Sequence, residues 1–294
     1  MHPTSQHLIK DVISILEDYY QAQSHATHVA WWLFEAVTKK NRLQILMVPN
    51  FQFTPEEEQQ VRFWIAKHTQ DDFPLQYLIG SVPFGPLDIL VEQPILIPRP
   101  ETEQWCASLI SNLQRCHNES LTILDMCSGS GCIGLWIAKT LPHSTVYSVD
   151  ISDQALSLAQ RNAEHNAITN IRFLRSNLFD ALTEDKQFDI IVSNPPYISP
   201  EVWSDLSPIV KQWEDRGALV AGQQGLEILH EIIQKAPYFL KKQSPITREG
   251  IARLVLEIGY DQGPSVEMLC KNRGFGIVKI LTDDAERDRV VCAW

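Results

Sequence analysis

The chain has 294 residues, of which 44% are hydrophobic and 21% charged, and these are ordinary values for a folded globular protein. It carries 25 Lys and Arg against 36 Asp and Glu, and this net charge of -11 argues against affinity based on neutralising many phosphates. No apolar run approaches the roughly 18 residues that a membrane span requires, so we expect no integration into a membrane.

The six cysteines are scattered, with no CxxC pair and no neighbouring His pair. This pattern disfavours both a zinc site and a disulfide framework, and we expect no bound metal. The first twenty residues contain Lys10 and no Arg, against three acidic residues, which is unlike a secretory signal or an organellar presequence.

Residues 1–72 are predicted to form a small bundle of three to five helices. Apolar residues recur at helical spacing between Leu8 and Tyr19, and residues 31–34 form a second apolar segment. Residues 54–57, Thr-Pro-Glu-Glu, are a capping box with proline at the first helical position, which predicts the start of a further helix.

Residues 73–103 contain six prolines and short alternating apolar stretches, which predict a β-hairpin or an extended linker. This segment ends in Leu-Ile-Pro-Arg-Pro-Glu-Thr-Glu, and a helix is expected to begin near Glu101. Two interpretations stay open for it. It is either a helix cap with a solvent-facing Arg99, or a segment that packs over a ligand pocket.

From residue 121 onward, short β-rich runs alternate with helical stretches. The β-rich runs include LTILDM, TVYSVD, IRFLRS, FDIIVS and ARLVLEIG. Alternation of this kind predicts an α/β fold with a doubly wound parallel sheet. The last residues offer two strands with no helix between them, which predicts a terminal antiparallel hairpin.

A glycine-rich loop follows the first strand of this region, from Asp125 through Gly129 and Gly131 to Gly134. Glycines let the backbone turn tightly and approach a ligand at the start of the next helix. Alone, the motif fits a dinucleotide site or a plain βα turn. Asp125 favours S-adenosyl-L-methionine (SAM), because a carboxylate can hold the methionine amino group. Asp150 ends the second strand, where it can accept hydrogen bonds from ribose hydroxyls.

The sequence Asn194-Pro195-Pro196-Tyr197 directly follows the apolar strand FDIIVS. The two prolines end the strand and fix the backbone, so that the Pro195 carbonyl and the Asn194 amide oxygen can act as two acceptors for a planar NH2 group. Tyr197 supplies an aromatic face for the flat side of that group. The alternative is a strand-ending turn with a core tyrosine. Trp203 and Trp213 follow, and either could line the substrate cleft or the core.

With these motifs, nearly the whole chain resembles the HemK-like protein N5-glutamine methyltransferases. The resemblance implies a class I SAM-dependent methyltransferase domain at 104–294, with a mostly parallel seven-stranded sheet. It also implies a helical N-terminal domain at 1–72 for substrate recognition, and a hairpin linker at 73–103. The segment PFGPLDILVEQPILIPRPETEQW is similar to fungal mitochondrial members that modify class I release factors.

The resemblance also implies roles for individual residues. It assigns catalysis to Asn194, Pro195, Pro196 and Tyr197. It assigns contacts with SAM to Asp125, Cys127, Ser128, Gly129, Ser130, Gly131, Asp150, Asn177, Leu178 and Asn194. The chain departs from the family pattern where Met126-Cys127 replaces Leu-Gly, and where Asn177 and Leu178 replace an acid and an aromatic residue.

The resemblance implies that the chain methylates the glutamine side chain in the Gly-Gly-Gln loop of a class I peptide chain release factor. Alternatives are an N6-adenine DNA methyltransferase, whose target is also a planar NH2, or a SAM-binding assembly factor without turnover. The net charge and the lack of a target-recognition domain argue against the DNA enzyme, and we expect no stable binding to nucleic acid. The mitochondrion is the implied compartment, with the cytoplasm as the alternative.

Overall fold

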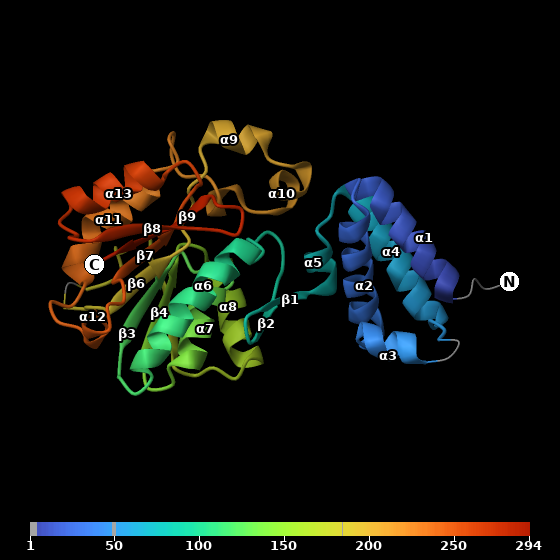
Figure 1. Ribbon diagram of the computed structural model, residues 1–294, viewed down its shortest axis with the longest axis horizontal. Helices are drawn as coiled ribbons and strands as arrows, with labels where there is room; N and C mark the ends of the chain where they lie inside the picture. The colour runs from blue at the N-terminus through green and yellow to red at the C-terminus, as the bar shows by residue number, and fades with distance from the viewer. Residues whose placement is uncertain (1–4, 49–50, 184) are drawn as a thin grey trace. The chain divides into compact units, whose positions relative to one another are not determined.

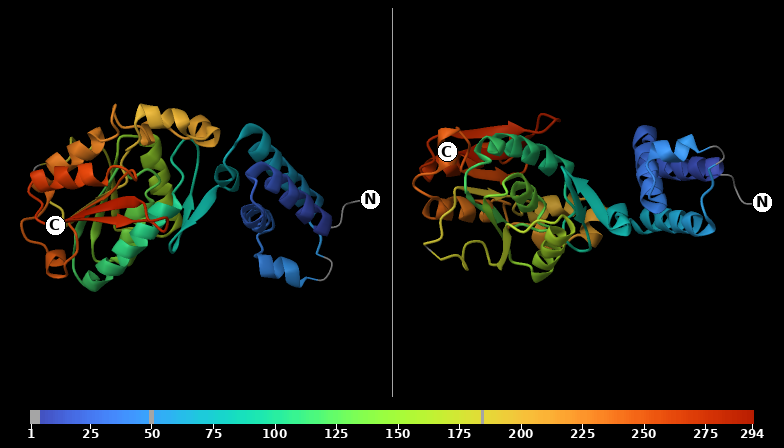
Figure 2. Two further views of the ribbon diagram at one scale, coloured as in Figure 1. Left: turned by 45° about the horizontal axis from the view of Figure 1, so that its top comes forward. Right: turned by 90° about the horizontal axis from the view of Figure 1, so that it is seen from below.

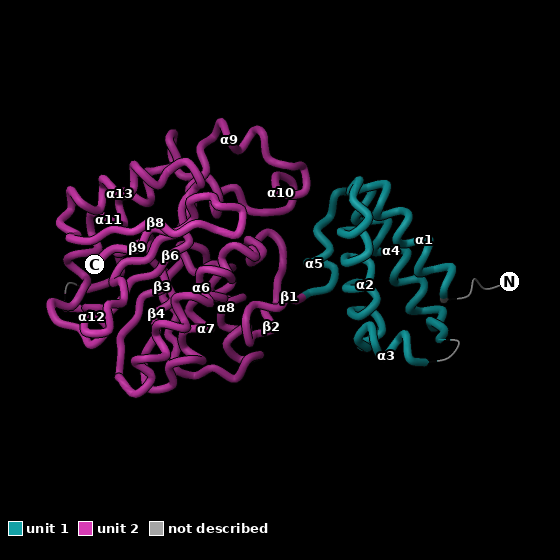
Figure 3. The backbone as a smooth tube through the Cα atoms, in the orientation of Figure 1, with its two compact units in different colours: residues 1–80 teal, residues 81–294 magenta. Residues whose placement is uncertain are grey.

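The structure is a computed structural model that describes residues 5–48, 51–183 and 185–294. It consists of two compact units, residues 1–80 and residues 81–294, which we call the helical unit and the sheet unit (Figures 1 and 3).

The helical unit contains five helices within its described residues, in agreement with the predicted bundle. They are α1 (Ser5–Tyr20), α2 (Gln23–Thr38), α3 (Arg42–Met47), α4 (Pro55–Asp71) and α5 (Leu75–Ile79). The capping box at α4 is confirmed: the Thr54 hydroxyl accepts from the Glu57 amide at 3.1 Å, and the Glu57 carboxylate accepts from the Thr54 amide at 2.8 Å. The helices enclose an apolar core, as their helical periodicity requires. Its fully buried members include Leu8, Leu16, Leu33, Phe34 and Val61.

The division between the units lies after Gly80, whereas the sequence predicted it after residue 72. The reason is the short helix α5, whose Leu75 is buried in the core of the helical unit. Gly80 ends this helix in the left-handed conformation, with φ of 88°, before the chain turns into the hairpin.

The sheet unit is built on a seven-stranded sheet in the order β5-β4-β3-β6-β7-β9-β8. Its strands are β3 (Thr122–Met126), β4 (Thr145–Asp150), β5 (Ile171–Arg175), β6 (Ile190–Ser193), β7 (Leu254–Glu257), β8 (Val278–Thr282) and β9 (Asp288–Ala293). Strands β3 to β7 pair in parallel, and β9 pairs antiparallel with both β7 and β8. The doubly wound sheet and its terminal antiparallel hairpin are thereby confirmed.

Helices cover both faces of this sheet (Figures 1 and 2). The longer ones are α6 (Pro100–Leu113), α7 (Cys132–Thr140), α8 (Asp153–His165), α11 (Glu227–Phe239) and α13 (Gly263–Asn272). Short helical turns complete the unit: α9 (Pro200–Asp205), α10 (Pro208–Trp213), α12 (Pro245–Arg248), η1 (Gln114–Cys116) and η2 (Arg216–Ala218). No sequence pattern predicted α9, α10 and α12. A proline at the first position opens each of them, but each is too short to show periodicity.

Residues 81–90 form a β-hairpin that belongs to the sheet unit, with strands β1 (Ser81–Phe84) and β2 (Leu87–Leu90). The buried amide of Asn162 on α8 holds the hairpin in place. Its oxygen accepts from the Leu90 amide at 2.7 Å, and its nitrogen donates to the carbonyls of Leu90 and Ser130 at 3.1 and 3.0 Å. One side chain therefore ties the hairpin to the glycine-rich loop.

No helix in the described parts of the chain is long and apolar enough to cross a membrane. Within those same residues, no group of three or more His, Cys, Asp or Glu side chains could hold a metal ion.

Candidate functional site

The glycine-rich loop turns at the carboxyl end of β3, through three residues in the left-handed conformation. These are Cys127, Gly129 and Gly131, with φ of 57°, 54° and 82°. A Cβ on Gly131 would lie 3.0 Å from the Cβ of Ala159 on α8, so this position needs glycine. Around Gly129 no atom lies within 4 Å of such a Cβ, and its backbone is therefore open to a ligand.

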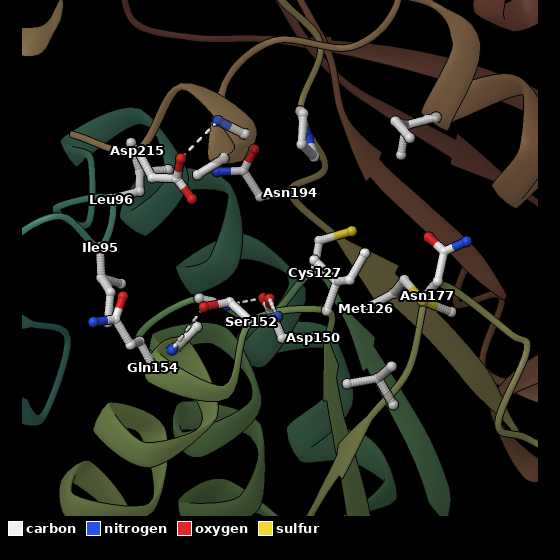
Figure 4. Close-up of a pocket in the computed structure, with 18 of the residues that line it drawn as sticks. Ile95, Leu96, Met126, Cys127, Asp150, Ser152, Gln154, Asn177, Asn194 and Asp215 are labelled. Carbon is white, nitrogen blue, oxygen red and sulfur yellow. Dashed lines mark hydrogen bonds between the residues drawn. The ribbon is translucent and has the colours of Figure 1, made fainter.

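A cavity of about 240 Å³ lies at the carboxyl ends of four neighbouring parallel strands (Figure 4). This is the edge at which doubly wound sheets bind ligands. Among the residues predicted for the cofactor, those that line the cavity are Cys127, Gly129, Asp150, Asn177, Leu178 and Asn194. Ser128, Ser130 and Gly131 do not line it, and they shape the loop behind its wall.

Asp150, at the end of β4, presents its carboxylate at the cavity wall. Its Oδ1 accepts from the amide of Ser152 at 2.9 Å, and its Oδ2 accepts from the amide of Gly129 at 2.8 Å. Burial raises the pKa of this carboxyl group, and the backbone hydrogen bonds oppose that shift. The two amides fix the carboxylate and leave each oxygen with further capacity to accept from hydroxyl groups.

Asp125 was expected to hold the ligand, but it is fully buried beneath the loop and is absent from the cavity wall. Its Oδ2 accepts from the amide of Gly134 at 2.9 Å, and no described residue bonds its Oδ1. Burial raises the pKa of this carboxyl to about 7. A half-paired buried carboxyl is costly, and Oδ1 keeps the capacity to accept one more hydrogen bond.

Asn177 and Leu178 line the far end of the cavity, after β5. The Asn177 amide donates to Asp180 at 3.2 Å. Leu178 has φ of 49° and is 5% exposed, so it contributes both to the apolar core and to the cavity wall. It offers an aliphatic surface where the family resemblance implies an aromatic one.

The motif Asn194–Tyr197 follows β6 and separates the first cavity from a smaller one of about 40 Å³. Asn194 and Pro196 line both cavities, and Pro195 and Tyr197 line the smaller one. The Tyr197 hydroxyl donates to Oε1 of the buried Glu257 at 3.2 Å, and burial together with this carboxylate raises the pKa of Tyr197. The side chain of Asn194 therefore lies where two adjoining cavities meet.

The residues before α6 cover the first cavity, which favours the second interpretation of the Leu96–Glu103 segment. Ile95 and Leu96 line the cavity, and Arg99 forms an ion pair with Glu214. Glu214 is buried, which raises the pKa of its carboxyl and makes the arginine a necessary partner. Beside this pair, the amide of Asp215 donates to the carbonyl of Pro94 at 2.7 Å.

Several lining residues were not predicted from the sequence, notably Ile95, Asp215 and Gly217. They come from segments more than a hundred residues apart in the chain, and no local pattern links them. Trp203 and Trp213, the two candidates for the substrate cleft, are partly buried and are absent from the walls of both cavities. The guanidinium of Arg216 lies 6.0 Å from the ring of Trp203.

Two family models match the chain. One is described as a methyltransferase small domain and matches residues 102–206, and the other is the PrmC N-terminal domain and matches residues 7–80. Among solved structures, a methyltransferase from Pyrococcus furiosus superposes with a TM-score of 0.50 at 16% identity, over 82% of this chain and 98% of that one. The predicted class I methyltransferase fold is confirmed.

Curated relatives cover most of the chain. A release factor glutamine methyltransferase of Salmonella typhimurium is 35% identical over 98% of this chain and 97% of its own. A protein of the same name from Fusobacterium nucleatum is 34% identical over 89% of this chain and 71% of its own.

Proposed function

The chain belongs to the family of release factor glutamine methyltransferases, and from this premise we propose that it transfers a methyl group from SAM to a glutamine side chain. The acceptor is the glutamine amide nitrogen in the Gly-Gly-Gln loop of a class I peptide chain release factor. The observation that carries the proposal is the place of Asn194, whose side chain borders both the larger and the smaller cavity.

The residues of the larger cavity fit SAM. Asp150 offers a fixed carboxylate for the ribose hydroxyls, and the open backbone at Gly129 offers close approach for the methionine part. Oδ1 of Asp125 has no partner among the described residues, and because Asp125 lies behind the cavity wall, a water molecule would have to connect it to the ammonium group of SAM. Asn177 and Leu178 would border the adenine. When bound, SAM supplies a methyl group on a positively charged sulfur.

The smaller cavity would admit the acceptor amide. Asn194 Oδ1 and the carbonyl of Pro195 are two acceptors for its two N–H bonds, and Tyr197 packs beside its flat face. Both hydrogen bonds strengthen as positive charge develops on the nitrogen, so they stabilise the transition state more than the ground state. An amide nitrogen is a weak nucleophile, and positioning contributes several kcal/mol to its reaction.

The nearby carboxylates are occupied by hydrogen bonds. Asp150 accepts from two backbone amides, and Glu257 accepts from Tyr197 and from two residues of α6. We therefore assign no general base to them, and the proton passes from the nitrogen to solvent water after methyl transfer.

The test incubates the protein with labelled SAM and, separately, with release factor, with release factor whose loop carries Gln→Ala, and with DNA. We expect label only on the unaltered release factor, and we expect Asn194→Ala to slow transfer by at least about a hundredfold. Label on DNA would instead support an N6-adenine methyltransferase. Binding of SAM without any transfer would support an assembly factor, and a wild-type rate in Asn194→Ala would contradict the proposed clamp.

We also propose that the helical unit recognises the release factor, because one glutamine side chain offers too little surface to select a protein. The match of residues 7–80 to a domain found in this family supports the proposal. Exposed apolar side chains on α3, among them Leu43, Leu46 and Met47, offer contact area.

A mitochondrial location is a further proposal, and it rests on the resemblance of residues 83–105 to fungal mitochondrial members. Imaging of a fluorescent fusion in a fungal cell tests it. Fluorescence that coincides with a mitochondrial marker is the expected outcome, and a diffuse cytoplasmic signal would contradict it.

A further inference from the structure

A buried chain of hydrogen bonds runs from the side chain of Asn194 to the carboxyl end of β7. Asn194 Nδ2 lies 3.2 Å from the hydroxyl oxygen of Thr102, and that hydroxyl lies 2.7 Å from Oε2 of Glu257. Thr102 and Glu257 are 2% and 1% exposed, so water does not compete for the bond between them, and the bond of Asn194 to Thr102 is partly buried. The chain connects α6, β7 and the residue that borders both cavities.

The direction of this chain follows from the groups that compose it. The indole nitrogen of Trp105, which can only donate, also bonds Oε2 of Glu257 at 2.7 Å. In its carboxylate form Glu257 can only accept, and its Oε2 accepts from both Trp105 and Thr102, while its Oε1 accepts from Tyr197.

Because Oε2 only accepts, the Thr102 hydroxyl must give its single proton to Glu257. Its oxygen can then only accept from Asn194, and the group of Asn194 that faces it must be the NH2. The amide oxygen of Asn194 is thereby turned the other way. Without this constraint, the two ends of an asparagine amide have nearly the same shape, and either could face the cavities.

We propose that Thr102, held by Glu257 and Trp105, is a positioning residue that fixes which end of the Asn194 amide faces the acceptor. The inference rests on the proposed function, because an oxygen is the required end only if the acceptor brings an NH2 group. With the amide reversed, two donors would face each other and the acceptor would be repelled.

The main variant is Thr102→Val, which keeps the shape of the side chain and removes the hydroxyl. We expect kcat for release factor methylation to fall about 10- to 100-fold, with KM for the release factor changed less than about threefold. Thr102→Ser keeps the hydroxyl and should recover most of the lost rate. Thr140→Val is the matched control, because the Thr140 hydroxyl donates to the Trp136 carbonyl at 3.0 Å, and Thr140 does not line either cavity.

A second measurement does not depend on activity. The protein is labelled with nitrogen-15 at asparagine, and the side-chain NH2 signals are recorded by NMR. The signals that are present in the wild type and absent from Asn194→Ala are those of Asn194. These signals should shift in Thr102→Val and stay close to their wild-type positions in Thr102→Ser and Thr140→Val. Circular dichroism and thermal unfolding establish that each variant is folded.

The outcomes separate this inference from the proposed function. If the wild-type protein methylates no release factor, the proposed function fails, and the NMR signals still report whether Thr102 holds Asn194. If Thr102→Val keeps the wild-type kcat, or leaves the Asn194 signals in place, the inference is overturned. It is also overturned if Thr102→Ser is as slow as Thr102→Val, because the loss then does not come from the hydroxyl.

Discussion

The sheet unit contains buried acidic side chains, whereas the described residues of the helical unit contain none. In the described residues of the helical unit no Asp or Glu is buried, and its buried polar side chains are Thr38 and His68. The sheet unit buries Asp125, Asp189, Glu214 and Glu257 among its carboxylates. Burial of a carboxylate is expensive unless hydrogen bonds or an opposite charge compensate.

The buried acids of the sheet unit also differ from one another. Asp189 lies at the start of β6, on the edge of the sheet away from the cavities, and its bonds are complete. It accepts from the Thr122 amide, the Ser244 hydroxyl and Lys241, at 2.7, 2.7 and 2.6 Å. Asp125, beneath the glycine loop, keeps one oxygen unpaired. Pairing alone therefore does not mark an acid as part of the site, since Asp150 at the cavity wall is bonded at both oxygens and Asp125 behind it is not.

Removal of residues 1–80 has the largest expected effect, and it tests whether the sheet unit binds SAM by itself while the helical unit recognises the release factor. We expect the remaining sheet unit to bind SAM and to methylate release factor about 100-fold more slowly in kcat/KM, because remote contacts no longer position the glutamine. Calorimetric titration of SAM and methylation kinetics measure the two effects separately. A short Gly-Gly-Gln peptide should be a poor substrate for both forms.

This truncation has an alternative outcome with a different meaning. If the shortened protein aggregates or loses its circular dichroism signal, the helical unit serves to cover apolar surface. If it folds, binds SAM and methylates intact release factor at the full rate, the helical unit has no part in recognition.

Asp150→Ala tests the acid at the cavity wall. We expect the affinity for SAM to fall by about 1–3 kcal/mol, because the ribose hydroxyls lose a charged acceptor. Asp189→Asn is the matched control, since it alters a buried acid at the opposite edge of the sheet. It should lower the thermal stability and leave the dissociation constant for SAM unchanged. Equal affinities in Asp150→Ala and the wild type would remove Asp150 from the binding site.

The features that could be predicted from the sequence are those that depend on residues close together in the chain. Helical periodicity, the capping box at Thr54 and the strand–helix alternation are local signals, and the structure contains the elements that they predict. The strand ends at Asp150 and Asn194 were predictable because parallel strands bring their carboxyl ends to one edge.

Features that depend on tertiary contacts were not predictable. Thr102 and Glu257 are 155 residues apart, and Arg99 and Glu214 are 115 apart, so no spacing rule connects them. The position of Asp125 beneath the loop depends on the left-handed turn that begins at Cys127, a residue type that rarely adopts this conformation. The unit boundary was misplaced because α5 is too short to show a period.

The smallest expected effect concerns His68, the buried ionisable group of the helical unit. Its Nδ1 lies 2.8 Å from the Phe73 carbonyl and its Nε2 lies 2.5 Å from the Tyr20 hydroxyl. Burial raises the pKa of Tyr20 to about 12, so this hydroxyl keeps its proton and donates it, and the ring is neutral with its own proton on Nδ1. Burial also lowers the pKa of His68 below its ordinary value.

The unfolded chain therefore takes up a proton on His68 at a higher pH than the folded chain does. As the pH falls through the ordinary histidine pKa of about 6.5, stability should decrease, by at most about 1.4 kcal/mol per pH unit for this one group. Glutamine at this position can donate to the Phe73 carbonyl and accept from Tyr20 without titrating. The thermal stabilities of wild type and His68→Gln are measured from pH 8 to pH 5. The difference between the two cancels the contributions of the titratable groups that both proteins share. We expect wild type to lose its advantage as the pH falls below 7, and parallel curves for the two proteins would show that His68 is not the group that titrates.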